Sequence, residues 1–146
     1  MENSNSSVEK VKKIKLDFKD SKYATGRRKR SIAKVWIKKG NGNIHVNGMK
    51  MNEYFKRPVH QIIVTRPLEI TQVSSNYDVK CSVKGGGLSG QAGAIILGIS
   101  KALIAHDENL KKNLKKDKLT TRDSRVVERK KYGHRKARRS FQFSKR

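Results

Sequence analysis

The last 25 residues of the chain, 122–146, contain eleven cations and almost nothing that can form a core. Such a segment cannot bury enough apolar surface to fold alone, so any compact domain must come from the residues before it. Guanidinium groups bind phosphates by paired hydrogen bonds, and aromatic rings stack on unpaired bases. A nonspecific polybasic tail or a nuclear-localisation signal is the alternative. The cations are Arg122, Arg125, Arg129, Lys130, Lys131, Arg135, Lys136, Arg138, Arg139, Lys145 and Arg146, interleaved with Tyr132, Phe141 and Phe143.

Charge dominates the rest of the chain as well. Lys and Arg number 36 against 12 acidic residues, which gives a formal net charge of +24 over 146 residues. Self-repulsion at this level disfavours a compact state unless a polyanion neutralises it. A pI near 10.5 indicates nucleic acid as that polyanion, although a charge kept only for solubility is the alternative. Apolar residues make up 34% of the chain, below the roughly 45–50% typical of globular domains, so the core must be small.

Composition also excludes several classes of protein. The single cysteine, Cys81, rules out an internal disulfide framework and a cysteine-only zinc cluster, and its alternating apolar surroundings predict a buried strand thiol. No apolar run approaches the roughly 20 residues of a membrane-spanning helix.

Residues 1–22 are polar and Lys-rich, and we expect a flexible extension there; an amphipathic helix around residues 11–18 is the alternative. The segment has no secretory apolar region, contains no arginine and carries four acids, unlike a mitochondrial transit peptide. We therefore expect a chain that is made where it works, or a mature form. The predicted organisation is this extension, a globular domain over residues 23–121 and a basic tail over 122–146.

The globular region begins with a predicted β-hairpin over residues 23–47. Ala33, Val35 and Ile37 alternate with polar positions, residues 39–42 supply a Gly-rich turn, and the alternation resumes afterwards. Trp36 falls on the more polar face. It can stack on a base there, but cross-strand packing or cover by a helix is favoured.

Residues 51–71 are less decisive. Pro58 suits the first turn of a short helix containing Val59, Ile62 and Ile63, which Pro67 would end. A strand over residues 62–65 is the alternative.

The second half of the domain gives clearer signals. Residues 77–83 alternate as a strand, and residues 91–106 have the apolar spacing of a helix that packs on the sheet. A short, solvated helix is expected over residues 109–118.

Two motifs precede the tail as candidate phosphate contacts. The first is the cation run Arg27, Arg28, Lys29 and Arg30 at the entrance to the first predicted strand; RNA backbone contact is favoured over a plain solvated face. The second joins a strand to a helix, where small residues and free helix N–H groups can approach a phosphate. A tight turn explains this second motif equally well. Its residues are Lys84, Gly85, Gly86, Gly87 and Gln91.

No catalytic constellation is present in the sequence. The four histidines have no metal-ligand spacing with one another or with Cys81. Ser89 lies in Gly-Leu-Ser-Gly, without the pattern of a hydrolase nucleophile elbow. We therefore expect no catalytic residue, no metal, no cofactor and no small-molecule substrate.

Several of these motifs together resemble ribosomal protein number nine of the small subunit. The resemblance is carried by Tyr23-Ala-Thr-Gly-Arg-Arg-Lys-Arg-Ser-Ile-Ala-Lys-Val, the Val46-Asn-Gly turn, Tyr54-Phe with Arg57-Pro58, and residues 85–91. It continues through Arg122-Asp-Ser-Arg-Val-Val-Glu-Arg-Lys-Lys-Tyr-Gly to the terminal Ser-Lys-Arg. The motifs occur in the family's order over residues 23–146, and the Arg-Ser-Phe-Gln variant is similar to alphaproteobacterial and mitochondrial members.

The resemblance implies an α+β fold, a two-layer α/β sandwich like the second domain of the fifth small-subunit protein, with the long basic tail attached. It implies a place in the small-subunit head, on the 3′ major domain of the ribosomal RNA and beside other ribosomal proteins. The tail would cross to the peptidyl site, where Ser144, Lys145 and Arg146 would meet transfer RNA. The expected location is a bacterial cytoplasm or, for an organelle-encoded chain, the mitochondrial matrix.

Two rival functions remain to be weighed. A free-standing DNA or RNA regulator would need a sequence-reading element, and the sequence has no helix-turn-helix pattern or RNP1 motif. A polybasic protein of the membrane surface would need an amphipathic helix with aromatic residues on one face, which the tail aromatics do not form, so we expect no membrane partner.

Overall fold

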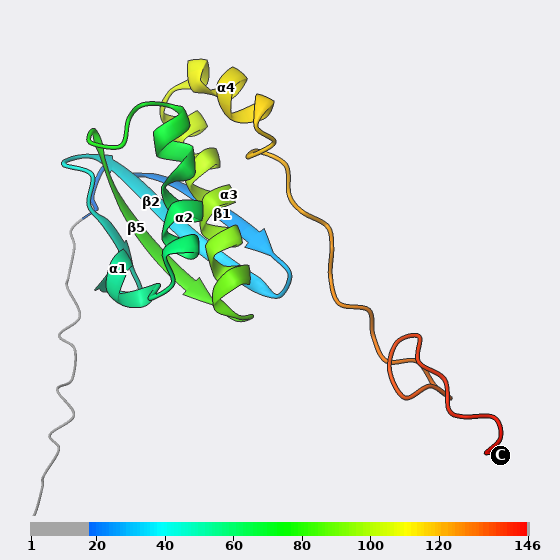
Figure 1. Ribbon diagram of the computed structural model, residues 1–146. Coiled ribbons are helices and arrows are strands. Elements are labelled where there is room, and N and C mark those ends of the chain that lie inside the picture. The colour runs from blue at the N-terminus through cyan, green and yellow to red at the C-terminus, as the bar shows by residue number, and fades with distance from the viewer. Residues whose placement is uncertain (1–17, 146) are drawn as a thin grey trace, which may run out of the picture.

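The computed structural model describes residues 18–145 (Figure 1). The extension predicted over residues 1–22 and the alternative helix over residues 11–18 therefore lie mainly outside the described residues, and Lys22 already belongs to the first strand. The chain folds as a mixed α+β structure around one five-stranded sheet of order β1-β2-β5-β3-β4. The strands are β1 (Lys22–Arg28), β2 (Ser31–Lys39), β3 (Ile44–Val46), β4 (Met49–Lys50) and β5 (Tyr77–Lys84).

The two longest helices pack on one face of this sheet (Figure 1). α3 contacts β1, β2 and β5, and α2 packs against α3. The helical elements are α1 (Met51–Tyr54), α2 (Pro58–Ile70), α3 (Leu88–His106), the 3-10 turn η1 (Glu108–Leu110) and α4 (Lys111–Lys116).

The predicted hairpin over residues 23–47 is wrong in its pairing. β2 pairs antiparallel with β1 and with β5, whereas β3 pairs parallel with β5 and is not paired with β2. The chain does reverse after β2, but β3 lies one place further along the sheet and leaves a gap that β5 fills. Asp78 of β5 holds the connection in place, because its Oδ1 accepts the backbone N–H groups of Asn41 (3.0 Å) and Asn43 (2.8 Å).

The helix predicted around Pro58 exists, but Pro67 does not end it. Pro58 stands in the first turn of α2, as predicted, and Pro67 lies inside the last turn. A proline there removes only one hydrogen bond, and its side chain is fully buried in the core. The buried face of α2 is His60, Val64, Pro67 and Leu68, which leaves Val59 and Ile62 more than 60% exposed.

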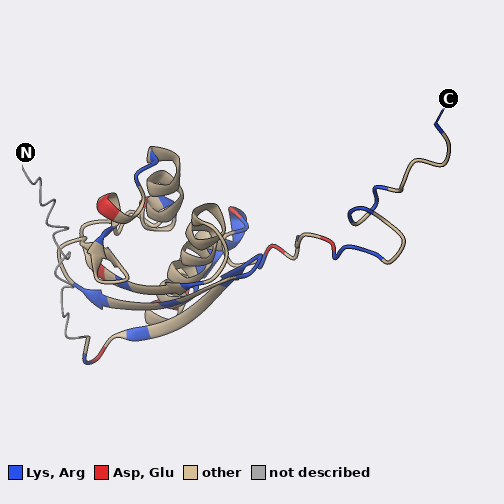
Figure 2. Ribbon diagram, turned by 90° about the horizontal axis from the view of Figure 1, so that it is seen from below, with Lys and Arg blue, Asp and Glu red and all other residues tan. Residues whose placement is uncertain are grey.

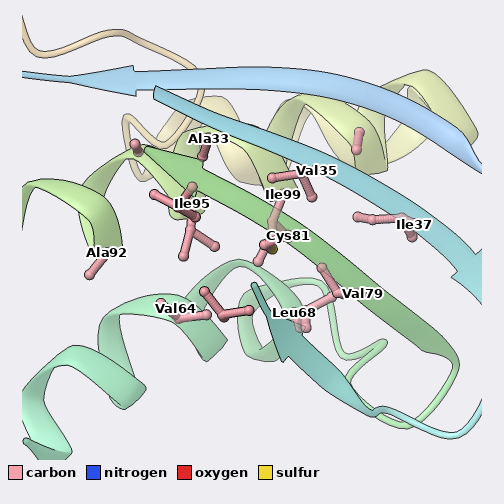
Figure 3. Packing of buried hydrophobic residues seen from close by; sticks show 14 of the residues in the cluster. Ala33, Val35, Ile37, Val64, Leu68, Val79, Cys81, Ala92, Ile95 and Ile99 are labelled. Atoms are coloured by element: carbon pink, nitrogen blue, oxygen red, sulfur yellow. The ribbon is translucent and has the colours of Figure 1, made fainter. Parts of the chain in front are cut away.

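The two elements with the clearest apolar periodicity are confirmed: the strand predicted over residues 77–83 is β5, and the helix predicted over residues 91–106 is α3. β5 turns Tyr77, Val79, Cys81 and Val83 toward the helices, and burial raises the pKa of the Cys81 thiol well above its usual range. Figure 3 shows Cys81 among Val35, Ile95 and Ile99. The predicted short helix after residue 107 is also present as η1 and α4, although Leu114 is fully buried rather than solvated.

The central helix lies unusually close to the sheet. A Cβ on Gly26 of β1 would overlap the carbonyl oxygen of Ala94 and come within 2.5 Å of the Gly98 nitrogen, both in α3. Glycine therefore sets the distance between strand and helix at this point. α3 is long and apolar enough to span a membrane by length and composition, but most of it is buried in this core, which is the environment of a core helix.

Candidate nucleic-acid interface

The cation run 27–30 forms the end of β1 and the turn into β2, rather than a strand entrance. Because successive strand residues point to opposite faces, Arg27 lies on the face of the sheet away from the helices and Arg28 on the helix face. Lys29 forms the turn with φ +51°, and both Lys29 and Arg30 are exposed. The sequence identified the cluster, but the folded chain directs its charges to the two opposite faces of the sheet and to the exposed turn.

Arg28 lies against α3 and reaches the beginning of the tail. Its side chain occupies the space above Gly93, where a Cβ would overlap Arg28 Cδ. Its Nη2 stands 3.5 Å from Asp123 Oδ2, while its Nε is buried without a hydrogen-bond partner. Asp123 thus lies near one nitrogen of the guanidinium group, whereas Nε has no acceptor among the described residues.

A cavity of about 420 Å³ opens at this place. Arg66 from α2 and the segment after α4 complete the walls around the end of β1. Five of the lining side chains are cations and two are acids, so an anion such as a phosphate group has the matching charge. The charged lining residues are Arg27, Arg28, Arg66, Lys118, Arg125, Asp117 and Asp123.

Asp123 supplies a counter-charge within this cavity. Its carboxylate accepts hydrogen bonds from Arg125 Nε (3.0 Å) and Nη2 (2.8 Å) and from the Arg125 backbone N–H (3.0 Å). These bonds, followed by the charges of Arg125 and Arg28, hold the pKa of the Asp123 carboxyl well below its usual range. The carboxylate accepts from the same type of donor that an RNA phosphate would use.

The glycine loop lies directly beside the β1–β2 turn. Ser31 Oγ donates to the Gly85 carbonyl (3.0 Å), and a Cβ on Gly85 would come within 2.6 Å of the Arg30 carbonyl oxygen. Gly85 and Gly86 have φ of +74° and +62°, so a tight turn accounts for both of them. Gly87 differs, because it has no positive φ and faces open space.

Gln91 has a structural task in this loop. Its Nε2 donates to the Gly85 carbonyl (3.2 Å), and its Oε1 accepts from the Tyr54 hydroxyl (2.7 Å). The amide therefore joins the loop to the end of α1. Lys84 is exposed at the end of β5.

α3 has no side-chain cap at its N-terminus, because the residue before the helix, Gly87, has no side chain. Ser89 in the first turn pairs with His60 of α2, with 3.0 Å between Oγ and Nε2. The other ring nitrogen of His60 is buried without a partner, so within residues 18–145 no carboxylate orients this histidine as a catalytic triad would require. The pair ties α2 to α3.

The tail leaves the domain and extends away from it (Figures 1 and 2). The contacts within the tail are local. Arg138 forms an ion pair with Glu128, and the Arg135 guanidinium lies 5.3 Å from the centre of the Phe141 ring. His134 and Ser140 form an isolated antiparallel β-bridge. Tyr132 and Phe143 are fully exposed. Figure 2 shows Lys and Arg along this segment and at the nearby end of the sheet. Arg146 lies outside the described residues.

The structure thus brings three separate sequence features to one end of the domain: the cation run, the glycine loop and the beginning of the tail. It adds Arg66, Lys118 and Asp123, which the sequence reasoning missed. Arg66 belongs to a helix with no basic pattern, and Lys118 stands in a lysine-rich stretch of similar residues. Asp123 carried the one usable signal, an acid between Arg122 and Arg125.

A small basic α+β domain with a polycationic tail has the features of an RNA-binding protein. The chain belongs to the ribosomal protein S9/S16 family, whose family model matches residues 26–146. It is therefore a structural protein of the small ribosomal subunit, which serves translation by binding ribosomal RNA and other ribosomal proteins, and its family is not one of enzymes.

Proposed function

We propose that the chain is the S9-type member of this family, seated in the head of the small subunit. Its domain, a two-layer sandwich like the second domain of the fifth small-subunit protein, binds the 3′ major domain of the ribosomal RNA beside neighbouring ribosomal proteins. Its tail reaches transfer RNA in the peptidyl site. The ordered series of motifs from residue 23 to residue 146 supports this choice within the family.

The gathering of cations at one end of the domain carries the ribosomal RNA part of the proposal. Arg27 to Arg30, the loop of Lys84 to Gly87, and the first tail cations share that end. RNA phosphates bound there would neutralise charges that otherwise repel one another. Further along the tail, Arg129, Lys130, Lys131, Tyr132, Arg135, Lys136, Arg138 and Arg139 would contact the same RNA.

The length of the tail carries the transfer RNA part. Fully extended, 25 residues span roughly 80 Å, and such a chain can pass through RNA crevices that exclude a globular domain. Ser144 and Lys145 are exposed at the far end, beyond the aromatic residues of the tail. Residues so far from the core cannot support it, whereas a terminal cation pair can bind a phosphate.

The RNA part is tested by replacing Arg27 and Arg30 with Ala and measuring RNA affinity over a range of salt concentrations. Each lost phosphate contact should reduce the log–log salt slope by about 0.7–0.9. The matched control replaces Lys112 and Lys116, two exposed cations of α4, which should leave the slope unchanged. Equal slopes for both double variants would show that Arg27 and Arg30 only face solvent.

The transfer RNA part is tested by deleting residues 144–146. Because each charge-assisted contact contributes about 1–3 kcal/mol, the loss should be tolerable to assembly but measurable in a ligand's dissociation. Small subunits carrying the truncated chain should assemble and release peptidyl-site transfer RNA faster than wild type. Unchanged release, or failed assembly, would return the tail to an architectural role.

The source of the chain fits two compartments, a bacterial cytoplasm and a mitochondrial matrix. The ribosomal RNA that co-purifies with the protein decides between them by its sequence.

A further inference from the structure

The sheet face opposite the helices carries a row of aromatic and cationic side chains. Strand register places one residue of each strand in this row, so the row crosses the whole sheet. Among the described residues no helix covers this face, and Tyr23 in the row is 48% exposed. The row consists of Tyr23, Trp36, Lys80, His45 and Lys50.

Tyr23 and Trp36 form its aromatic part. They are direct cross-strand partners, with ring centroids 5.3 Å apart and an interplanar angle of 41°. Lys80 Nζ lies 6.0 Å from the Trp36 ring and 5.7 Å from the ring of Phe18. Cross-strand packing, the favoured prediction for Trp36, is therefore present, and Trp36 is still only partly buried.

A hollow of about 340 Å³ adjoins Trp36 on this face. Ile32, Lys34, Ser82 and Lys84 line it together with the indole. The hollow thus combines an aromatic wall, an aliphatic wall and two ammonium groups. A nucleotide offers the complementary chemistry, a flat base and an anionic phosphate.

The charge of this face is predominantly positive. Arg27 and Lys38 extend the cations of the row and the hollow along β1 and β2. Asp78 is the one acid that the described strands present on this face, and it already accepts the backbone N–H groups of Asn41 and Asn43. A polyanion is therefore the partner with matching charge.

We propose that this sheet face binds unpaired nucleotides of RNA, with a base stacked on Trp36 and Tyr23 and the backbone held by Lys34 and Lys84. A duplex cannot use the aromatic rings, because its bases are already stacked on one another. The chain's own residues 1–17 are a poorer occupant, since they contain four lysines and three acids and lack the required negative charge. The inference specifies the RNA binding proposed above and assigns a second face to it.

Trp36 is the only tryptophan in the chain, so its fluorescence reports on this face alone. The experiment titrates the full-length protein with a single-stranded oligonucleotide and with a duplex of equal length, and follows both RNA anisotropy and Trp36 emission. The single strand should quench the emission, while the duplex binds through other cations and leaves the emission unchanged. Polyglutamate, a polyanion without bases, should also leave it unchanged.

Variants separate stacking from folding. The double change Tyr23→Ala and Trp36→Ala should weaken single-strand binding about tenfold or more and affect duplex binding little. The single change Trp36→Phe keeps an aromatic ring at this position and should retain most of the single-strand affinity. Val59→Ala is the matched control, because it removes an exposed apolar side chain of α2, on the helix side of the sheet, and should change neither the single-strand affinity nor the quenching of Trp36. Circular dichroism and thermal melting verify that each variant is folded.

Other outcomes overturn the inference. RNA that binds without changing Trp36 emission would place the unpaired strand elsewhere and leave the proposed function intact. Equal quenching by polyglutamate would remove the need for bases. A shift of Trp36 emission on deletion of residues 1–17, without a response to RNA, would assign the face to that segment. Failure of every RNA to bind would count against the proposed function itself.

Discussion

Gly86 and Gly87 are neighbours in sequence with different structural requirements. Gly86 has φ +62°, and a Cβ there would overlap Ser31 Oγ. We expect Gly86→Val to lower the free energy of unfolding by about 1–3 kcal/mol, because a β-branched residue is strained at positive φ. Denaturant unfolding of the purified protein measures the loss, and a stability equal to wild type would contradict it.

Gly87→Val isolates the binding role of the same loop. Its φ is −107° and no atom lies within 4 Å of the added Cβ, so stability should stay within about 0.5 kcal/mol of wild type. If an RNA phosphate approaches this backbone, the valine should weaken RNA affinity. An unchanged affinity in a fully folded Gly87→Val protein would mean that the loop is only a turn.

Asp123 yields a pH prediction at the same scale. Hydrogen bonds from Arg125 hold the pKa of the Asp123 carboxyl below its ordinary value of 3.8. A carboxyl whose pKa is lower in the folded than in the unfolded protein stabilises the fold at pH values above its unfolded-state pKa. This contribution is lost as the pH falls from the unfolded-state pKa through the folded-state pKa. The carboxyl carbon shift of Asp123, followed by NMR, should therefore stay constant from pH 7 down past 3.8. A midpoint near 3.8 would show that these hydrogen bonds are absent in solution.

At the scale of elements, we expect the close contact between β1 and α3 to be sensitive to substitution. Gly26→Ala would force Ala94 and Gly98 away from the strand, and overpacking of this kind typically costs about 1–3 kcal/mol. We expect a lower melting temperature for Gly26→Ala. Thr25→Ala, on the exposed face one residue earlier, is the control and should cost less. Equal melting temperatures for the two variants would mean that the backbone can relax.

The elements also show where sequence reasoning succeeds. β5 and α3 were predictable because their apolar residues repeat clearly with period two and with helical spacing. The position of β3 was not, because a strand that turns back beside β2 and one that skips a place have the same alternation. The choice depends on a later segment, residues 77–84, which occupies the position between them. Pro67 was misjudged because its burial depends on packing against other elements rather than on its neighbours in sequence.

The candidate site divides in the same way. The cation run, the glycine loop and the tail were identified as runs of residue types, which a sequence displays directly. Their meeting at one end of the domain depends on the register of β1 and β2 and on the path after α4. Arg66 joins them from α2 only in the folded chain.

At the scale of the whole molecule, the backbone amides of the domain and of the tail should differ sharply in their protection from hydrogen exchange. After Asp123, the hydrogen bonds and ion pairs of the described tail residues are local, whereas β2, β5 and α3 supply much of the buried core. In the free protein, the backbone amides of residues 122–145 should exchange with solvent at rates close to those of an unfolded chain, and those of the core should be slowest. Hydrogen exchange measured by NMR tests this, and protection of the tail in the absence of RNA would contradict it.

The attachment of the tail beside Arg28 also bears on how assembly proceeds in time. Once the domain has docked, the tail no longer searches solution but a volume bounded by its own length. Its cations are then present around the RNA at an effective concentration that for short flexible linkers reaches the millimolar range. Individually weak contacts can therefore form in sequence outward from Asp123, each shortening the remaining free chain. In the proposed complex the domain would therefore act as an anchor, and the tail would close onto the RNA progressively from that anchor.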